Sequence, residues 1–178
     1  APRLLCSAAT IFREELGADD EAEAALRRAL ELDPRHLPAL EALAELQLGA
    51  GRLAELVQTE RAMLALDLPP ERRRQRLAGL ARLHLQLSQQ GADGDHVEGC
   101  IGCCSEALAV DPTDEEATDV LVEVCVAHQR WEVLIEQLDL DSGPACALRG
   151  LVAAGTATGR WALAARASRR LAERAGDD

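Results

Sequence analysis

The sequence predicts an all-α fold of about five stacked antiparallel helix pairs, and three observations point to it. Between Gly17 and Pro34 a turn opens a run of apolar residues at helical spacing, and a proline closes it. The same turn, helix and proline stop begin again at Gly51, thirty-four residues later. Strand-like character is confined to one short valine-rich piece, Val120 to Val126, which lies inside a longer helical pattern.

Prolines and acidic residues set the helix boundaries in the first half of the chain. Asp19 or Asp20 is expected to cap a helix whose end is set by Pro34, because the residue before a proline is disfavoured in the α conformation. Pro38 is well placed in a first turn, and the two prolines at 69–70 break the chain before another helix. The expected helices are 3–16, 20–32, 38–48, 53–66 and 71–89.

Turn and cap patterns organise the second half in the same way. Residues 90–95 form a glycine-containing turn that is longer than the turn at Gly17. Thr113 followed three residues later by Glu116 is a capping-box pattern, so a helix is expected to begin there. Residues 141–144 are the clearest loop. The expected helices are 96–110, 114–128, 131–138, 144–156 and 161–175.

The copies share small and bulky residues at fixed places on both helices, a glycine in the turn and a proline at the end. The pattern is carried by Gly17, Ala22, Leu26, Ala29 and Pro34, by Leu40, Leu43, Ala44, Gln47 and Gly51, by Cys100, Cys104, Ala107 and Pro112, and by the Arg-Trp pairs at 130–131 and 160–161. It resembles the tetratricopeptide repeats over nearly the whole chain. Tyrosine is absent, the third copy is longer than the family's period and the fourth is shorter.

This resemblance implies a right-handed superhelix in which the first helix of each repeat lines the concave side. The approximate repeats are 3–36, 37–70, 71–114, 115–144 and 145–175. The family is a general protein-binding scaffold, so the resemblance implies a scaffold or adaptor and not an enzyme. No catalytic residue is nominated.

Composition excludes several classes of partner. The net charge is −12, and an acidic domain repels nucleic acid and anionic lipid, so neither is expected. No apolar run approaches the roughly eighteen residues that a membrane span needs, so no membrane insertion is expected. With no targeting segment and no initiator methionine, we expect a cytoplasmic protein that is a segment of a larger chain or a member of a multi-protein complex.

Four candidate metal ligands lie near one face of a single predicted helix: His96, Cys100, Cys103 and Cys104. Because three thiolates and an imidazole can hold a metal ion, a metal-binding or thiol-based regulatory protein is one alternative. Cys100 and Cys104 also occupy core positions of the repeat pattern, and cysteine packs as a small hydrophobe. Core packing is therefore the preferred interpretation, and no cofactor is expected.

Other conspicuous residues are assigned structural places. The remaining histidines are expected on the surface or at helix ends: His36, His84 and His128. Trp131 and Trp161 are expected to pack the two helices of a repeat together. The run from Arg72 to Arg76 is expected to be a solvated face, with docking of an acidic segment as the alternative.

The concave positions implied by the resemblance give the candidate binding residues. They are Glu116, Asp119, Glu123 and Val126 in the fourth copy, and Glu41, Glu45 and Leu48 in the second. Carboxylates that share one helix face concentrate negative potential, so the expected partner is a protein with a basic segment. Two other interpretations stay open, namely a solvated acidic face that serves solubility and a structural spacer arm between functional domains.

Overall fold

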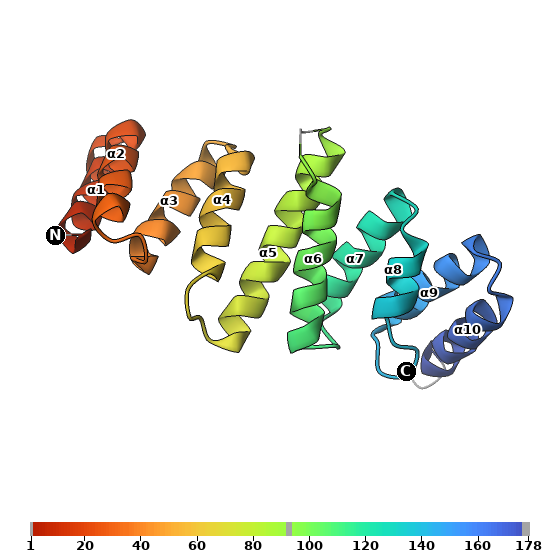
Figure 1. Ribbon diagram of the computed structural model, residues 1–178. Helices are drawn as coiled ribbons and strands as arrows, with labels where there is room; N and C mark the ends of the chain where they lie inside the picture. Colours follow the sequence, from red (N-terminus) through yellow and green to blue (C-terminus); the bar gives the residue numbers. More distant parts are fainter. Residues whose placement is uncertain (1, 92–93, 176–178) are drawn as a thin grey trace. The chain divides into compact units, whose positions relative to one another are not determined.

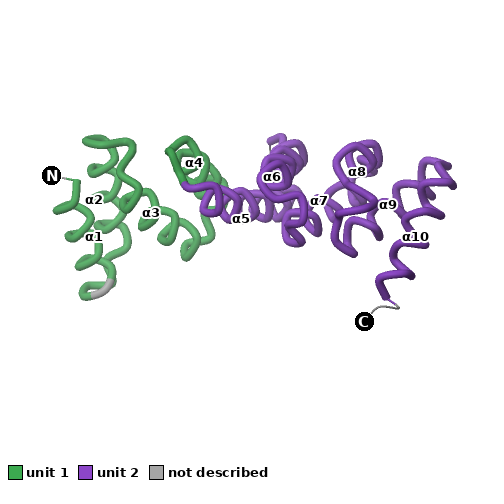
Figure 2. Tube along the Cα trace, turned by 90° about the horizontal axis from the view of Figure 1, so that it is seen from below, with its two compact units in different colours: residues 1–68 green, residues 69–178 purple. Residues whose placement is uncertain are grey.

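The computed structural model describes residues 2–91 and 94–175, which form ten α-helices and no strand (Figure 1). The helices are α1 (Pro2–Leu16), α2 (Asp19–Leu32), α3 (Leu37–Gly49), α4 (Leu53–Leu64), α5 (Pro70–Gln89), α6 (His96–Val110), α7 (Glu115–Ala127), α8 (Trp131–Gln137), α9 (Ala145–Ala157) and α10 (Trp161–Ala175). The chain divides into two compact units, residues 1–68 with α1 to α4 and residues 69–178 with α5 to α10 (Figure 2).

The predicted all-α fold is confirmed, with helices packed in sequential antiparallel pairs. Every predicted helix forms within two residues of its expected bounds, and α6 and α10 begin and end where predicted. The valine-rich piece 120–126 lies inside α7, as its longer helical pattern indicated. In the part of the chain that the structure describes, no helix combines the length and apolarity needed to cross a membrane.

The glycines that mark the period are required by the backbone. Gly17 and Gly51 follow the first helix of their pairs with φ angles of 60° and 69°. In this left-handed region a Cβ is unfavourable, so glycine is the default residue. Gln129 takes the same place after α7 with φ 56°, in spite of its side chain. The turn between the helices of a pair therefore keeps its conformation even where glycine is lost.

The predicted cap of α2 is wrong. Asp19 and Asp20 lie in the first turn of the helix, and the N-cap is Ala18, whose side chain makes no capping hydrogen bond. The two carboxylates still lie near the positive end of the helix dipole, where negative charge is favourable. They contribute to the start of α2 through charge and not through a side-chain cap.

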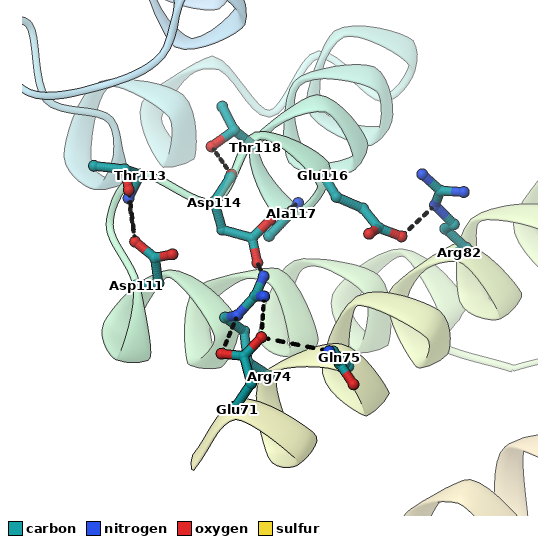
Figure 3. Close-up of polar contacts among 10 residues, drawn as sticks. All are labelled: Glu71, Arg74, Gln75, Arg82, Asp111, Thr113, Asp114, Glu116, Ala117 and Thr118. Carbon is teal, nitrogen blue, oxygen red and sulfur yellow. Dashed lines mark hydrogen bonds and ion pairs between the residues drawn. The ribbon is translucent and has the colours of Figure 1, made fainter.

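The predicted capping box of α7 is also wrong (Figure 3). The N-cap is Asp114, whose Oδ1 accepts the N–H of Ala117 at 3.0 Å. Thr113 instead donates its hydroxyl to the Asp111 carboxylate at 2.7 Å, and Glu116 points toward α5. Both Thr113 and Asp114 are cap-forming residue types, so the local pattern alone did not distinguish them.

Small side chains let the helices of residues 1–68 pack closely. The core cluster joins α1, α2 and α3 through Ala9, Ala22, Leu26, Ala29, Ala39, Leu43 and Leu46. Between α3 and α4, the buried hydroxyl of Thr59 donates to the Gln47 side chain at 2.7 Å. The buried polar atoms of this pair are thus satisfied, as a stable core requires.

The core of residues 69–178 joins α5, α6, α7, α8 and α9. Its buried residues are Ala81, Leu85, Cys100, Ile101, Cys104, Val120, Leu121, Val124, Cys125, Leu134 and Ala154. Trp131 is half-buried and packs against this cluster, as predicted. The α9–α10 pair also packs closely, because a Cβ on Gly155 would lie 2.9 Å from the backbone nitrogen of Ala164.

Three arginines link consecutive helix pairs from equivalent turns. Each immediately precedes the second helix of its pair and forms an ion pair with a carboxylate near the start of the second helix of the preceding pair. The pairs are Arg52 with Glu23 at 3.1 Å, Arg130 with Glu98, and Arg160 with Glu132 at 2.8 Å. The hydrogen bond from Arg52 is the main reason that the pKa of Glu23 is lowered. We call these three pairs the arginine ladder.

Candidate functional site

The candidate residues of the second unit lie on one exposed face of α7. Glu116, Asp119 and Glu123 are three and four residues apart and are all exposed, so their side chains leave the same side of the helix. Val126 continues this face and is 41% exposed. The buried residues of α7 occupy its other side. We call these four residues the α7 face.

Two polar side chains of α5 bind the α7 face. Arg82 Nε lies 3.0 Å from Glu116 Oε1 (Figure 3), and Gln89 Nε2 donates to Glu123 Oε1 at 3.0 Å. Arg82 and Gln89 are seven residues apart, as are Glu116 and Glu123, so the two helices are bonded twice in the same register. The side chains of the ion pair are 62% and 47% exposed, and such exposed pairs are weak.

Asp119 lies on the same face but within reach of α9. It hydrogen-bonds with the thiol of Cys146, and burial together with this bond raises the pKa of Cys146 to about 11. Among the described residues, neither Asp119 nor Glu123 has a cationic partner. The negative charge that remains open on the α7 face is therefore at Asp119 and Glu123, whereas Arg82 neutralises Glu116.

The candidate residues of the first unit lie on α3. Glu45 is exposed and forms an ion pair with Arg13 of α1 at 2.7 Å, while Glu41 is half-buried. Leu48 is 59% exposed. This set belongs to the unit of residues 1–68, so it forms a face of its own.

Sequence reasoning missed two exposed apolar residues on α1. Leu4 is 77% exposed and Ile11 is 56% exposed, and their seven-residue spacing puts them on one side of the helix. The buried Ala9 belongs to another side. The available signal was a second apolar stripe in a helix that needs only one for its core.

The helices match several solved structures. A tetratricopeptide repeat protein from Parabacteroides merdae has a TM-score of 0.55 at 17% identity, with 99% of this chain and 68% of that chain covered. MamA has a TM-score of 0.52 at 17% identity, covering 89% and 88%. PilF of Pseudomonas aeruginosa has a TM-score of 0.51 at 14% identity, covering 100% and 82%. The chain has the tetratricopeptide-repeat fold. No protein-family model matches the sequence, and no curated protein matches it.

Within each unit, the tetratricopeptide-repeat fold brings separated charged segments together. Arginines near both ends of the second unit's sequence pair with the acidic stretch between them. The pairs include Arg73 with Glu106, Arg74 with Asp114, Arg82 with Glu116, Arg160 with Glu132 and Arg170 with Asp141. The prediction of a solvated face at 72–76 is therefore wrong for Arg73 and Arg74, whose acidic partners are in the same chain.

Arg74 forms the least exposed of these ion pairs (Figure 3). Its guanidinium bonds to Asp114 and, through two nitrogens at 2.6 and 3.2 Å, to both oxygens of Glu71. Hydrogen bonding to Glu71, which has the largest effect, and to Asp114 raises the pKa of Arg74. Since Asp114 also caps α7, this network holds the beginning of the helix that carries the α7 face.

The proposed metal ligands are not arranged as a metal site in the part of the chain that the structure describes. Cys100 and Cys104 are fully buried in the core with Cys125, while the ring of His96 contacts His84 on α5. A hydrogen bond with Cys100 and burial raise the pKa of Cys104, and burial raises the pKa of Cys125 to about 12. Metal binding requires thiolates, which these surroundings oppose. In the described ranges no group of three or more potential ligands is arranged to hold a metal ion.

Replacing both Cys100 and Cys104 with alanine is expected to lower the free energy of unfolding by roughly 1–2 kcal/mol, because buried volume is lost. Urea unfolding followed by circular dichroism measures this change. A chelator is expected to leave the parent's unfolding midpoint unchanged. Stoichiometric zinc in the purified parent, or unfolding by the chelator, would contradict core packing of these thiols.

The histidine prediction is wrong for His84. This side chain is only 1% exposed, and its Nδ1 lies 3.0 Å from Nδ1 of His96. Gly99 on α6 makes room for it, since a Cβ there would lie 2.6 Å from the ring. His36 and His128 do lie at helix ends, as predicted, where His36 Nδ1 accepts the N–H of Ala39 at 3.3 Å.

The prediction for Trp161 is also wrong. It begins α10 after an arginine, as Trp131 begins α8, yet it is 68% exposed. The sequence pattern is the same in both places, and the difference is that another helix pair comes after α8 in the described chain. Local sequence therefore did not reveal the difference.

Proposed function

We propose that this chain is a protein-binding scaffold or adaptor in a larger assembly. A partner contacts the exposed faces of the helices that come first in their pairs, such as α3 and α7. The tetratricopeptide-repeat fold is generally a protein–protein interaction module and typically non-catalytic. The observation that supports this location is the α7 face, where the uncompensated carboxylates of Asp119 and Glu123 lie beside the exposed Val126. An acidic face that served only solubility would not need the exposed apolar side chain of Val126 beside its carboxylates.

The chemistry of the α7 face favours a peptide or helix that carries lysine or arginine together with an apolar residue. The cation would bind near Asp119 and Glu123, and the apolar residue would cover Val126. A second cation at Glu116 would have to compete with Arg82. On α3, Glu41, Glu45 and Leu48 form a smaller face of the same character, in which Arg13 already holds Glu45.

The expected setting is a reducing compartment such as the cytoplasm. All six cysteines are free thiols, among them the fully buried Cys100, Cys104 and Cys125. Free buried thiols are usual in proteins of reducing compartments.

A matched pair of double variants tests the α7 face. Asp119→Asn with Glu123→Gln removes its two open charges, and Asp67→Asn with Glu136→Gln removes two exposed acids elsewhere. A partner captured by the parent and identified by mass spectrometry is expected to bind the first variant roughly tenfold more weakly and the second as tightly as the parent. Binding should also weaken as salt rises, because exposed charge pairs are screened.

The parent and the two double variants must have equal helicity by circular dichroism, so that a change in affinity does not arise from unfolding. Equal affinity of the partner for both variants would remove the α7 face as its binding site. A protein that captures no partner at any salt concentration would favour the spacer arm over the adaptor.

A further inference from the structure

Among the described residues nothing covers the outer side of α10, whereas the matching side of α8 is covered. Trp131 and Ile135 of α8 and Leu138, the residue directly after it, follow one side of the helix and are half-buried against the core. On α10 the residues in the same places are all exposed, and they are Trp161, Ala165 and Ser168. Ala172 extends this row by one more turn and is exposed as well. We call the four residues of α10 the α10 row.

The structure shows what covers the matching side of α8. Helix α9 packs there, and a Cβ on its Gly150 would lie 3.4 Å from Leu138 Cδ1 and 2.7 Å from Val122 of α7. The bulky side chain of Leu138, at the end of α8, is thus met by a residue without a side chain on α9. Because interiors are close-packed, the small residues of the α10 row suit the reverse arrangement, a helix with bulky apolar side chains.

The charges beside the α10 row decide which charged residues are favourable on the two sides of a helix bound there. Residues 145–175 contain six arginines and one glutamate, within a chain of net charge −12. Arg166 and Arg169 directly follow Ala165 and Ser168, so they flank the row, and both are exposed. Among the described residues neither has an acidic partner, whereas Arg160 and Arg170 do. The free cations favour carboxylates on the ligand.

We propose that the α10 row binds an acidic amphipathic helix of a partner protein, in the way that α9 packs on α8. The partner helix places leucine-sized residues over Ala165, Ser168 and Ala172, and carboxylates beside Arg166 and Arg169. Trp161 closes over one end of it and is the largest apolar contact. This surface is separate from the α7 face, and the inference does not depend on the function proposed there.

Two synthetic helical peptides serve as probes. Both have about 18 residues, long enough to form a helix on binding, with leucine at positions i, i+4, i+7 and i+11. One carries glutamate on the flanking positions and the other carries lysine. In a Trp131→Phe background Trp161 is the sole tryptophan, so its emission is expected to shift to the blue when the glutamate peptide covers it. The lysine peptide is expected to leave the emission unchanged.

Variants of the row are measured by calorimetry with the glutamate peptide. Trp161→Ala is expected to weaken binding about thirtyfold, and Arg166→Gln with Arg169→Gln roughly tenfold with a smaller salt dependence. Ala165→Glu places a charge in the row and is expected to abolish binding. Its matched control is Ala109→Glu, the same change at an exposed position of α6, which is expected to bind as the parent does.

Several results would overturn the proposal. They are the absence of binding, equal binding of both peptides, and unchanged binding after Ala165→Glu. Sedimentation of the full chain adds one more. Self-association that Ala165→Glu removes would identify a second copy, and not an acidic helix, as the occupant of the α10 row.

Discussion

Replacing Asp114 with alanine is expected to lower the free energy of unfolding by about 3 kcal/mol. The side chain is 2% exposed and does two things at once, because it caps α7 through the N–H of Ala117 and neutralises Arg74 of α5. Loss of a cap alone costs about 1 kcal/mol, and the remainder arises because Arg74 is left with its charge only partly balanced. Urea unfolding followed by circular dichroism measures the change.

Two further variants separate the cap from the charge. Asp114→Asn keeps an oxygen for the N–H of Ala117 but removes the charge that Arg74 binds, so an intermediate loss of stability is expected. Glu116→Gln breaks the neighbouring but exposed pair with Arg82, and at most about 1 kcal/mol is expected to be lost. If Asp114→Ala costs no more than Glu116→Gln, the buried pair does not hold α5 and α7 together.

Replacing Gly99 with alanine is expected to destabilise the protein by about 2 kcal/mol, although alanine is the better helix former. The added Cβ would lie 2.6–2.9 Å from three atoms of the His84 ring, and that ring is 1% exposed and cannot move into solvent. The thermal unfolding midpoint of the variant should fall accordingly.

The control is the same substitution three residues later on the same helix. A Cβ on Gly102 would meet nothing within 4 Å, so Gly102→Ala is expected to stabilise the protein by about 0.5–1 kcal/mol. Removing the ring with His84→Ala should make Gly99→Ala nearly harmless in the double variant. Additive effects of the two substitutions would contradict the close approach of α5 and α6.

The helices were predictable because their signals are local. Apolar spacing defines each helix within its own residues, and glycines such as Gly17 and prolines such as Pro34 mark the ends. The candidate faces were predictable only as positions on helices, by way of the family resemblance. The exposure of Glu116, Asp119 and Glu123 agrees with that expectation, and their role in binding stays a prediction.

The predictions that failed concern contacts between residues far apart in the chain. Arg74 and Asp114 are forty residues apart, and their contact decides which residue caps α7. His84 is buried because α6 offers Gly99 opposite it. Trp161 repeats the local sequence of Trp131, yet it is exposed where Trp131 packs against the core. None of these arrangements leaves a periodic or compositional trace in the sequence.

The arginine ladder bears on how such a chain changes length. The dipeptide Arg-Trp occurs at 130–131 and at 160–161, and in both places the tryptophan begins a helix, α8 or α10. Each arginine forms its ion pair with a carboxylate of the preceding helix pair. Removal of residues 131–160 would therefore join Arg130 to Trp161 and recreate the same turn with the bond to Glu98 in place. Such a removal would take out α8 and α9 and leave α7 followed directly by α10, so the chain would be shorter by one helix pair. The ladder would keep its bond at the new turn, whereas the packing of α10 would have to adapt from Gly155 of α9 to the residues of α7.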